Sequence, residues 1–262
     1  MTTRVTPGRA VIAVAAIVIA QSLLWYAAVS LRDAPTPSYD ALSVVLGILS
    51  AGLLGSLGEW AVHRYSMHTP RRNRILNVPY ELHHVAHHWH HYTPDRFTHA
   101  GPIKYHPTHD PNLVCDTNAG RYWVAVQQYT YYMFFGLFFV FLPAWIITRN
   151  VFFMAGLVAA IVWVCTMFVH VHGVTHHPGH RLIERFSWFQ FLKRHHYIHH
   201  IDNGCNVNFL LPLCDLLFGT LRLTLHPREV ERWGTYEEAL ARVVPVGDTA
   251  SGVALQSPKI TL

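Results

Sequence analysis

Residues 83–91 read HHVAHHWHH, so histidine fills six of nine consecutive positions. Three further clusters share this composition: HRYSMH at 63–68, HGVTHH at 172–177 and HHYIHH at 195–200. Histidines inside the clusters recur at i, i+3 and i+4, a spacing that places side chains on one face of an α-helix. Neutral imidazole is the commonest protein ligand for a transition metal. The repeated spacing therefore predicts a shared metal site rather than a basic surface tract.

The predicted ligands are the histidines that keep this spacing, together with a pair in the first cluster that is five residues apart. They are His63, His68, His87, His90, His91, His172, His176, His196, His199 and His200. His63 and His68 would lie about 140° apart on an ideal helix, so we expect them to serve different metals or to sit where the helix ends. Ten imidazoles exceed the roughly four ligands of a closed structural zinc site. A dinuclear site is predicted, and imidazole ligation suits Fe, Zn, Cu or Ni.

The composition indicates a membrane protein. The chain has 262 residues, of which 51% are hydrophobic and 13% charged, whereas about a quarter of the residues of a soluble domain are charged. Four apolar runs are predicted to span a bilayer, at about residues 10–31, 41–62, 123–148 and 151–171. The first run could instead be a cleaved signal peptide, because Arg4 and Arg9 precede it, but its length favours a retained span. The predicted fold is an all-α integral membrane protein with four transmembrane helices and a cytoplasmic helical cap.

The distribution of basic residues predicts the orientation. Four spans place both termini and all histidine clusters on one side, which then carries every Lys and Arg except Arg32 and Arg149. The positive-inside rule assigns this side to the cytoplasm. Residues 1–225 are expected to form the membrane-embedded domain and 226–262 a cytoplasmic tail, in which Thr235 and Glu238 form a capping box that opens a short helix. The basic loops lack nucleic-acid-binding signatures, and lipid headgroups explain them more simply.

The combined histidine pattern resembles the fatty acid hydroxylase/sterol desaturase superfamily over roughly residues 55–222. The matching motifs are HxxxxH at 63–68, HxxHH at 87–91, HxxxH at 172–176 and HxxHH at 196–200, followed by NFLLP at 208–212 and DLLFGT at 215–220. The resemblance implies a membrane di-iron oxidoreductase that acts on a lipid with O₂ and takes electrons from a separate donor of the cytochrome b5 or ferredoxin type. Two Fe ions would be the cofactor, with Zn possible in the isolated protein.

The sequences of the first two motifs resemble those of the fatty acid 2-hydroxylase branch. The HRYxMH motif also resembles that of carotenoid hydroxylases. No cytochrome b5 domain is fused to this chain, and the Arg-Leu-Val stretch expected after the second motif is missing. The separation of the first two motifs favours His87, His90 and His91 over the overlapping set His84, His87 and His88. The carotenoid hydroxylase spacing leaves His177 as an alternative to His176.

The expected reaction is O₂-dependent hydroxylation of a fatty acyl, sterol or isoprenoid lipid, with desaturation at the same site as a close alternative. No side chain beyond the metal ligands is expected to act as a nucleophile or general base. A histidine-rich metal transporter or sensor is the alternative from another class. Transporters place ionisable ligands near the middle of their spans, whereas residues 10–31, 41–58 and 151–169 contain no His, Asp or Glu.

Overall fold

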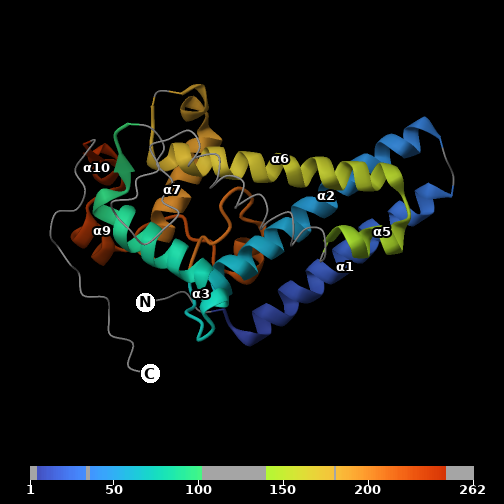
Figure 1. Cartoon of the computed structure of the whole chain (residues 1–262), viewed down its shortest axis with the longest axis horizontal. Helices are drawn as coiled ribbons and strands as arrows, with labels where there is room; N and C mark the ends of the chain where they lie inside the picture. The colour runs from blue at the N-terminus through green and yellow to red at the C-terminus, as the bar shows by residue number, and fades with distance from the viewer. Residues whose placement is uncertain (1–4, 34–35, 102–139, 180, 246–262) are drawn as a thin grey trace.

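The computed structural model describes residues 5–33, 36–101, 140–179 and 181–245, and these are mostly helical. Figure 1 shows three long helices that converge at one end of the molecule and shorter elements that gather at the other. The long helices are α1 (Pro7–Arg32), α2 (Pro37–Val62) and α6 (Val151–His176). α2 continues into a π-helical turn, η1 (His63–Met67), which makes a helix of 31 residues. Each is long and apolar enough to cross a membrane.

The helix starts follow from ordinary capping chemistry. Thr6 accepts a hydrogen bond from Arg9 N, Thr36 accepts one from Tyr39 N, and a proline opens each of these two helices. Asn150 caps α6 by accepting from two backbone N–H groups, and Arg149 before it adopts the left-handed conformation with φ 48°. A tight turn at Arg149 and Asn150 therefore precedes α6. It joins α6 to the short helix α5 (Leu142–Thr148).

The third predicted span, 123–148, falls largely outside the described residues, and only its end is seen as α5. The described part of the chain thus has three candidate spans where four were predicted over the whole sequence. Side chains on the outer faces of the long helices are exposed, including Ile12 at 71%, Leu23 at 63% and Trp163 at 62%. Large apolar side chains in this position suit contact with lipid.

Helices α2 and α6 approach each other through glycine. A Cβ at Gly47 would lie 2.8 Å from Leu157 N and closer still to Phe153 O, and a Cβ at Gly156 would meet the Val44 backbone at 2.8 Å or less. The other buried positions of α2 are also small; they are Ser43, Ser50, Ala51 and Ser56, apart from Trp60 near the end. Small residues let membrane helices pack backbone against backbone.

Two buried polar contacts tie the bundle together. Gln21 of α1 donates to Ser50 of α2 at 2.6 Å, and Asn150 donates to Ala28 O at 2.9 Å and to Ser43 at 3.0 Å. In an apolar bundle such bonds fix which helix faces meet, because a lost partner leaves a polar group without water.

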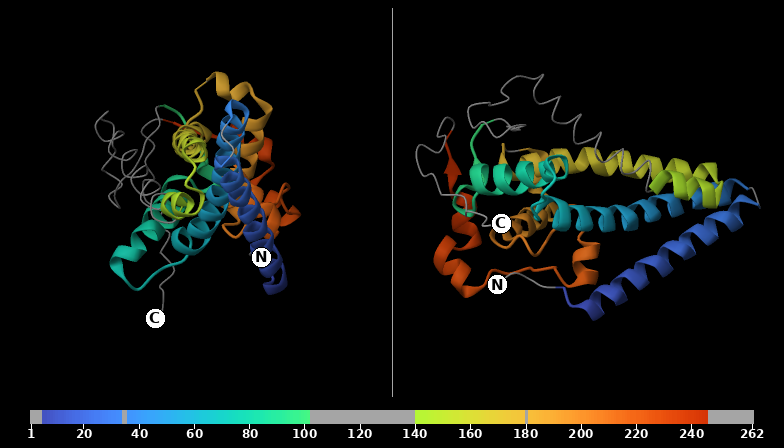
Figure 2. Two further views of the ribbon diagram at one scale, coloured as in Figure 1. Left: turned by 90° about the vertical axis from the view of Figure 1, so that its right-hand side faces the viewer. Right: turned by 60° about the horizontal axis from the view of Figure 1, so that its bottom comes forward.

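The remaining elements form a cap beyond one end of the bundle (Figures 1 and 2). In chain order they are α3 (Arg74–Tyr80), the π-helix η2 (Glu81–His91), η3 (Pro94–Arg96), β1 (Thr98–His99), η5 (Leu182–Arg185), α7 (Ser187–Ile201), α8 (Leu213–Phe218), α9 (Pro227–Trp233), α10 (Tyr236–Ala241) and β2 (Val243–Val244). The predicted capping box is confirmed, since Thr235 accepts from Glu238 N and α10 follows. β1 and β2 form a short parallel pair, the one departure from an all-α fold within the described residues.

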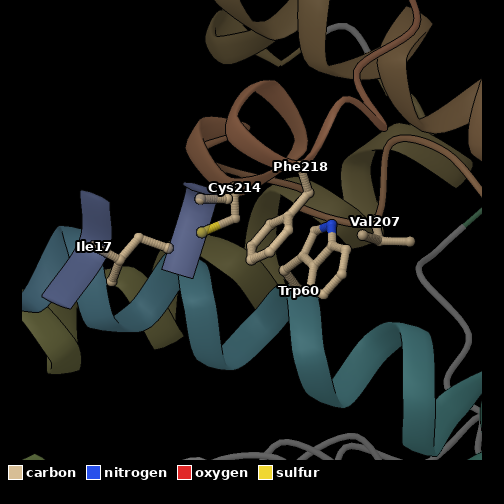
Figure 3. Close-up of a cluster of buried hydrophobic side chains, with 6 residues drawn as sticks. Ile17, Trp60, Val207, Cys214 and Phe218 are labelled. Atoms are coloured by element: carbon tan, nitrogen blue, oxygen red, sulfur yellow. The ribbon is translucent and has the colours of Figure 1, made fainter. Parts of the chain in front are cut away.

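The first helix also contacts the cap. Arg9 donates from Nε to Leu217 O at 3.0 Å and from Nη2 to Leu216 O at 2.8 Å, and so satisfies carbonyls at the end of α8. Ala13 and Ile17 of α1 pack with Trp60, Cys214 and Phe218 in one buried cluster (Figure 3). Helix α8, which follows the last histidine cluster, is thus held between α1 and α2.

Candidate metal centre

Four segments bring ten histidines together where the bundle meets the cap. The end of α2 with η1 contributes two, η2 three, the end of α6 two and α7 three. The ten are His63, His68, His83, His87, His88, His172, His176, His196, His199 and His200. Eight of them are among the predicted ligands, so the structure converges the four clusters as the spacing predicted.

The first group contains His63, His68, His83, His88 and His199, whose ligand atoms all lie within 4.8 Å of one another. Its contacts join Nε2 atoms: His63 to His83 at 2.8 Å, His68 to His199 at 3.1 Å and His83 to His88 at 3.1 Å.

The second group contains His87, His172, His176 and His196. His176 Nε2 lies 3.1 Å from His196 Nε2, and His200 Nε2 lies 3.0 Å from the same atom. A third set, His87, His88 and His200, overlaps both groups because His88 belongs to the first and His87 to the second. The histidines thus form overlapping groups, each able to hold a metal ion.

The π-helical turns explain which histidines meet. In a π-helix the hydrogen bond runs from residue i+5 to residue i, and this bond is present from His68 N to His63 O at 3.1 Å and from Tyr92 N to His87 O at 2.8 Å. Residues five apart therefore share a face. His63 and His68 therefore both lie in the first group, and they sit where the helix ends, which is the second of the two predicted outcomes.

The same geometry changes the assignment in the second cluster. His83 and His88 are five apart and both enter the first group, whereas His90 and His91 enter none. His90 is exposed, and His91 offers its backbone carbonyl to His99 Nε2 at 2.8 Å. The structure therefore does not bring His90 and His91 to the other predicted ligands. The missed signal was the repetition of the His63–His68 spacing by His83–His88.

The structure also places the other histidines of the clusters, including those that the sequence left open as alternative ligands. His84 lies outside the groups, although its Nδ1 is 2.9 Å from His68 Nδ1. His176 lies in the second group, whereas His177 instead contacts the Tyr92 hydroxyl at 2.8 Å. His195 is buried beside the site, outside the groups, with its Nε2 3.7 Å from Asp215.

Backbone carbonyls fix the ring orientation of four grouped histidines. Nδ1–H donates to a carbonyl in each case: His63 to Val207, His176 to Phe97 at 2.9 Å, His199 to Cys205 at 2.8 Å and His200 to Tyr92 at 2.6 Å. A carbonyl oxygen only accepts, so Nδ1 carries the proton and Nε2 presents its lone pair. Such contacts orient metal-binding imidazoles in proteins.

The Nε2 lone pairs point at one another, and a bound cation would relieve their electrostatic repulsion. His176 and His200 both direct an unprotonated Nε2 at His196 Nε2, which carries at most one proton to share. Nitrogens bound to one metal at about 2.0–2.1 Å stand roughly 2.9–3.4 Å apart, and the measured separations fall at or close to this range. The residues therefore fit a bound transition metal in each group.

Burial keeps the imidazoles in the form that binds metal. It lowers the pKa well below the ordinary value for all six grouped histidines of η2 and α7, and the charge of neighbouring imidazoles lowers the pKa further. These six are His83, His87, His88, His196, His199 and His200. Neutral imidazole is the metal-binding state.

Glu59 has a structural role. Its carboxylate accepts from Phe209 N at 2.9 Å and Asn208 Nδ2 at 3.2 Å, and it belongs to neither histidine group. Among the described residues no Asp, Glu or Cys joins these groups. The donor set is therefore entirely imidazole.

No family model, curated protein or solved structure matches this chain. The assignment of the site accordingly rests on its own geometry.

Proposed function

We propose that this protein is a membrane oxidoreductase that hydroxylates a lipid with O₂ at a dinuclear iron site. The observation that carries the proposal is the pair of all-imidazole groups, overlapping through His87, His88 and His200, at the end of helices able to span a membrane. The motif resemblance described above supports the same reaction. Iron bound there supplies O₂ activation and C–H oxidation when two electrons and two protons arrive, and water is the second product.

The ligand arrangement supports a redox site more than a transport site. The grouped histidines lie at one end of α2 and α6, and residues 41–58 and 151–169 of these helices contain no His, Asp or Glu. An ion crossing the bilayer needs ligands near the midplane. Ten converged imidazoles also exceed what an inert structural zinc site uses.

The surroundings of the second group suit an apolar substrate. Phe168 and Phe209 flank His172 with ring centroids 5.5 Å and 5.4 Å away, and Phe209 lies 4.9 Å from His196. His172 Nε2 is buried and has no hydrogen-bond partner among the residues that the structure describes. Aromatic rings here exclude water from one side of the histidines, which favours reaction at an apolar chain.

Exposed apolar side chains next to arginines support a position of the site near lipid headgroups. Ile75 is 80% exposed and Leu76 62% exposed on α3, directly after Arg71, Arg72 and Arg74. Leu182 and Phe186 repeat the pattern beside Arg181 and Arg185. Such pairings suit the boundary between acyl chains and anionic headgroups. The cytoplasmic orientation and the separate electron donor are part of this proposal.

The test is isotope labelling with iron-loaded protein in lipid vesicles, supplied with a reductant and ¹⁸O₂. One ¹⁸O atom per product molecule is expected, lost in His88→Ala and retained in His90→Ala. Label from H₂¹⁸O instead of ¹⁸O₂ would contradict hydroxylation by O₂. A new double bond without oxygen would assign desaturation at the same residues.

A further inference from the structure

The backbone carbonyls of the loop at residues 205–209 orient histidines of the first group. Its Cys205 and Val207 carbonyls accept from Nδ1 of His199 and His63, respectively. The corresponding carbonyls for the other two oriented histidines, His176 and His200, come from residues 97 and 92 in another segment. The carbonyls that orient the two groups thus come from different parts of the chain, while the Phe209 ring of the same loop packs against His172 and His196 of the second group.

Asp215 of α8 holds this loop in place. Val207 N donates to Oδ1 at 3.1 Å, Asn208 N donates to Oδ2 at 2.8 Å, and Thr220 Oγ1 donates to Oδ1 at 2.6 Å. The Asp215 side chain is fully buried. The peptide that orients His63 through its C=O is therefore held through its N–H by a carboxylate that water does not reach.

Glu59 continues the same pattern by accepting from Phe209 N at 2.9 Å. Three consecutive backbone N–H groups, at residues 207, 208 and 209, consequently end on two carboxylates. Glu59 lies one helical turn before His63, so the loop and the histidine it orients are fixed to the same helix end.

The far side of the carboxylate is packed against α2. Trp60 Nε1 donates to Thr220 Oγ1 at 3.0 Å, and the Trp60 ring stacks on Phe218 with centroids 4.0 Å apart. Figure 3 shows the two rings facing each other beside Cys214. This packing leaves Asp215 little freedom to follow a shifted loop.

We propose that Asp215 is a positioning residue for the first histidine group, acting through Val207 and the 205–209 loop, and that it tunes metal affinity there without affecting the second group. The proposal deepens the proposed function, since it rests on each group binding a metal. Asp215→Asn keeps the shape but offers one accepting oxygen instead of two. One of the three donors then faces an amide N–H, and the Val207 carbonyl loses its fixed position.

The experiment is a Co²⁺ titration of the full-length, metal-depleted protein in detergent, followed by the visible absorption of bound cobalt. The parent is expected to bind two Co²⁺ per chain. Asp215→Asn is expected to bind one normally and the other about 10- to 100-fold more weakly, the usual effect of losing a contact that orients a ligand.

A double-mutant cycle assigns the weakened site. His172 belongs only to the second group and His63 only to the first. Asp215→Asn is expected to weaken the remaining site in a His172→Ala background and to have no effect in a His63→Ala background. Equal effects in both backgrounds, or two parental affinities in Asp215→Asn, would overturn the proposal.

Controls separate positioning from loss of stability. Asn150→Ala removes a helix cap and two buried hydrogen bonds at the opposite end of α6, and it should lower stability while keeping both cobalt affinities. If Asp215→Asn does not fold, Thr220→Val removes one donor to Asp215 and should weaken the same site by a smaller factor; an unchanged affinity there would contradict the role of Asp215. A parent that binds two Co²⁺ but oxidises no lipid contradicts the proposed function alone, and a parent that binds fewer than two contradicts both.

Discussion

The contact between α2 and α6 predicts that a single methyl group far from the histidines disturbs the metal centre. In Gly156→Ala the new Cβ would lie 2.8 Å from the Val44 carbonyl carbon, and ordinary contact begins at 3.4 Å. The helices must therefore separate locally by more than about 0.6 Å, because the Val44 carbonyl oxygen lies closer still to the new Cβ. Metal–ligand distances tolerate only about 0.2 Å. The end of α2 bears His63 of the first group and α6 bears His172 of the second, while both groups also take histidines from η2 and α7, so a shift of either helix strains its group against those two elements.

We expect Gly156→Ala and Gly47→Ala to lose about 1–3 kcal/mol of unfolding free energy, as overpacked cores do, and to bind cobalt more weakly. Unfolding by SDS titration in bicelles measures the first quantity and cobalt titration the second. Gly55→Ala is the matched control on α2, because no atom of the described residues lies within 4 Å of its Cβ position. It should be neutral, or stabilise by about 0.5–1 kcal/mol. Equal midpoints for Gly47→Ala, Gly156→Ala and the parent would refute the backbone contact between α2 and α6.

Three further predictions concern the histidines and the cap. His88→Ala should bind fewer than two metals per chain by elemental analysis, while His90→Ala, at an exposed position, should keep the parental number; the reverse result would restore the α-helical assignment. The metal-free protein should lose stability as the pH falls below about 6.5, because histidines whose pKa is lowered by burial stay neutral when folded and take up protons only on unfolding. Its unfolding midpoint should be flat above about pH 7 and fall towards about pH 5, and a flat profile throughout would contradict the burial of these rings. Arg9→Ala removes two hydrogen bonds to α8 and should lower the free energy of unfolding by about 1–3 kcal/mol. Faster proteolysis after residue 210 is the readout. Arg32→Ala, at the other end of α1, should leave that cleavage unchanged.

The sequence predicted the convergence of the histidine clusters because α-helical spacing is a local property. His172 and His176 lie on regular α6, and His196, His199 and His200 lie on regular α7, so i+3 and i+4 neighbours share a face as expected. The second cluster failed the same rule because η2 is π-helical, which selected His83 and His88 over His90 and His91. π-helices are rare and concentrate at functional sites. The α-helical periodicity of 3.6 residues per turn therefore fails to predict which side chains share a face at the site itself.

The supporting contacts were beyond the reach of sequence patterns. Glu59 holds the 205–209 loop from 150 residues away, and Asp215 holds it from seven or eight residues away; nothing in the local sequence indicates which backbone N–H each carboxylate meets. The role of Gly47 and Gly156 likewise depends on two helices that are over a hundred residues apart in the chain. The third predicted span stays a prediction, since most of it lies outside the described residues.

The contact of Arg9 with the end of α8 also sets an order of assembly. Its two acceptors follow it by 207 and 208 residues, which a ribosome adding about 5–20 residues per second needs roughly 10–40 s to synthesise. Until residue 207 is added, a nascent chain can already contain His63 and His68, but it lacks the Val207 carbonyl that orients His63. A nascent chain that ends before His199 lacks one of the five imidazoles of the first group. If the first group binds a metal as proposed, its ligand set and the carbonyl that orients His63 are complete only after the segment through α8 has been synthesised and has met the first helix.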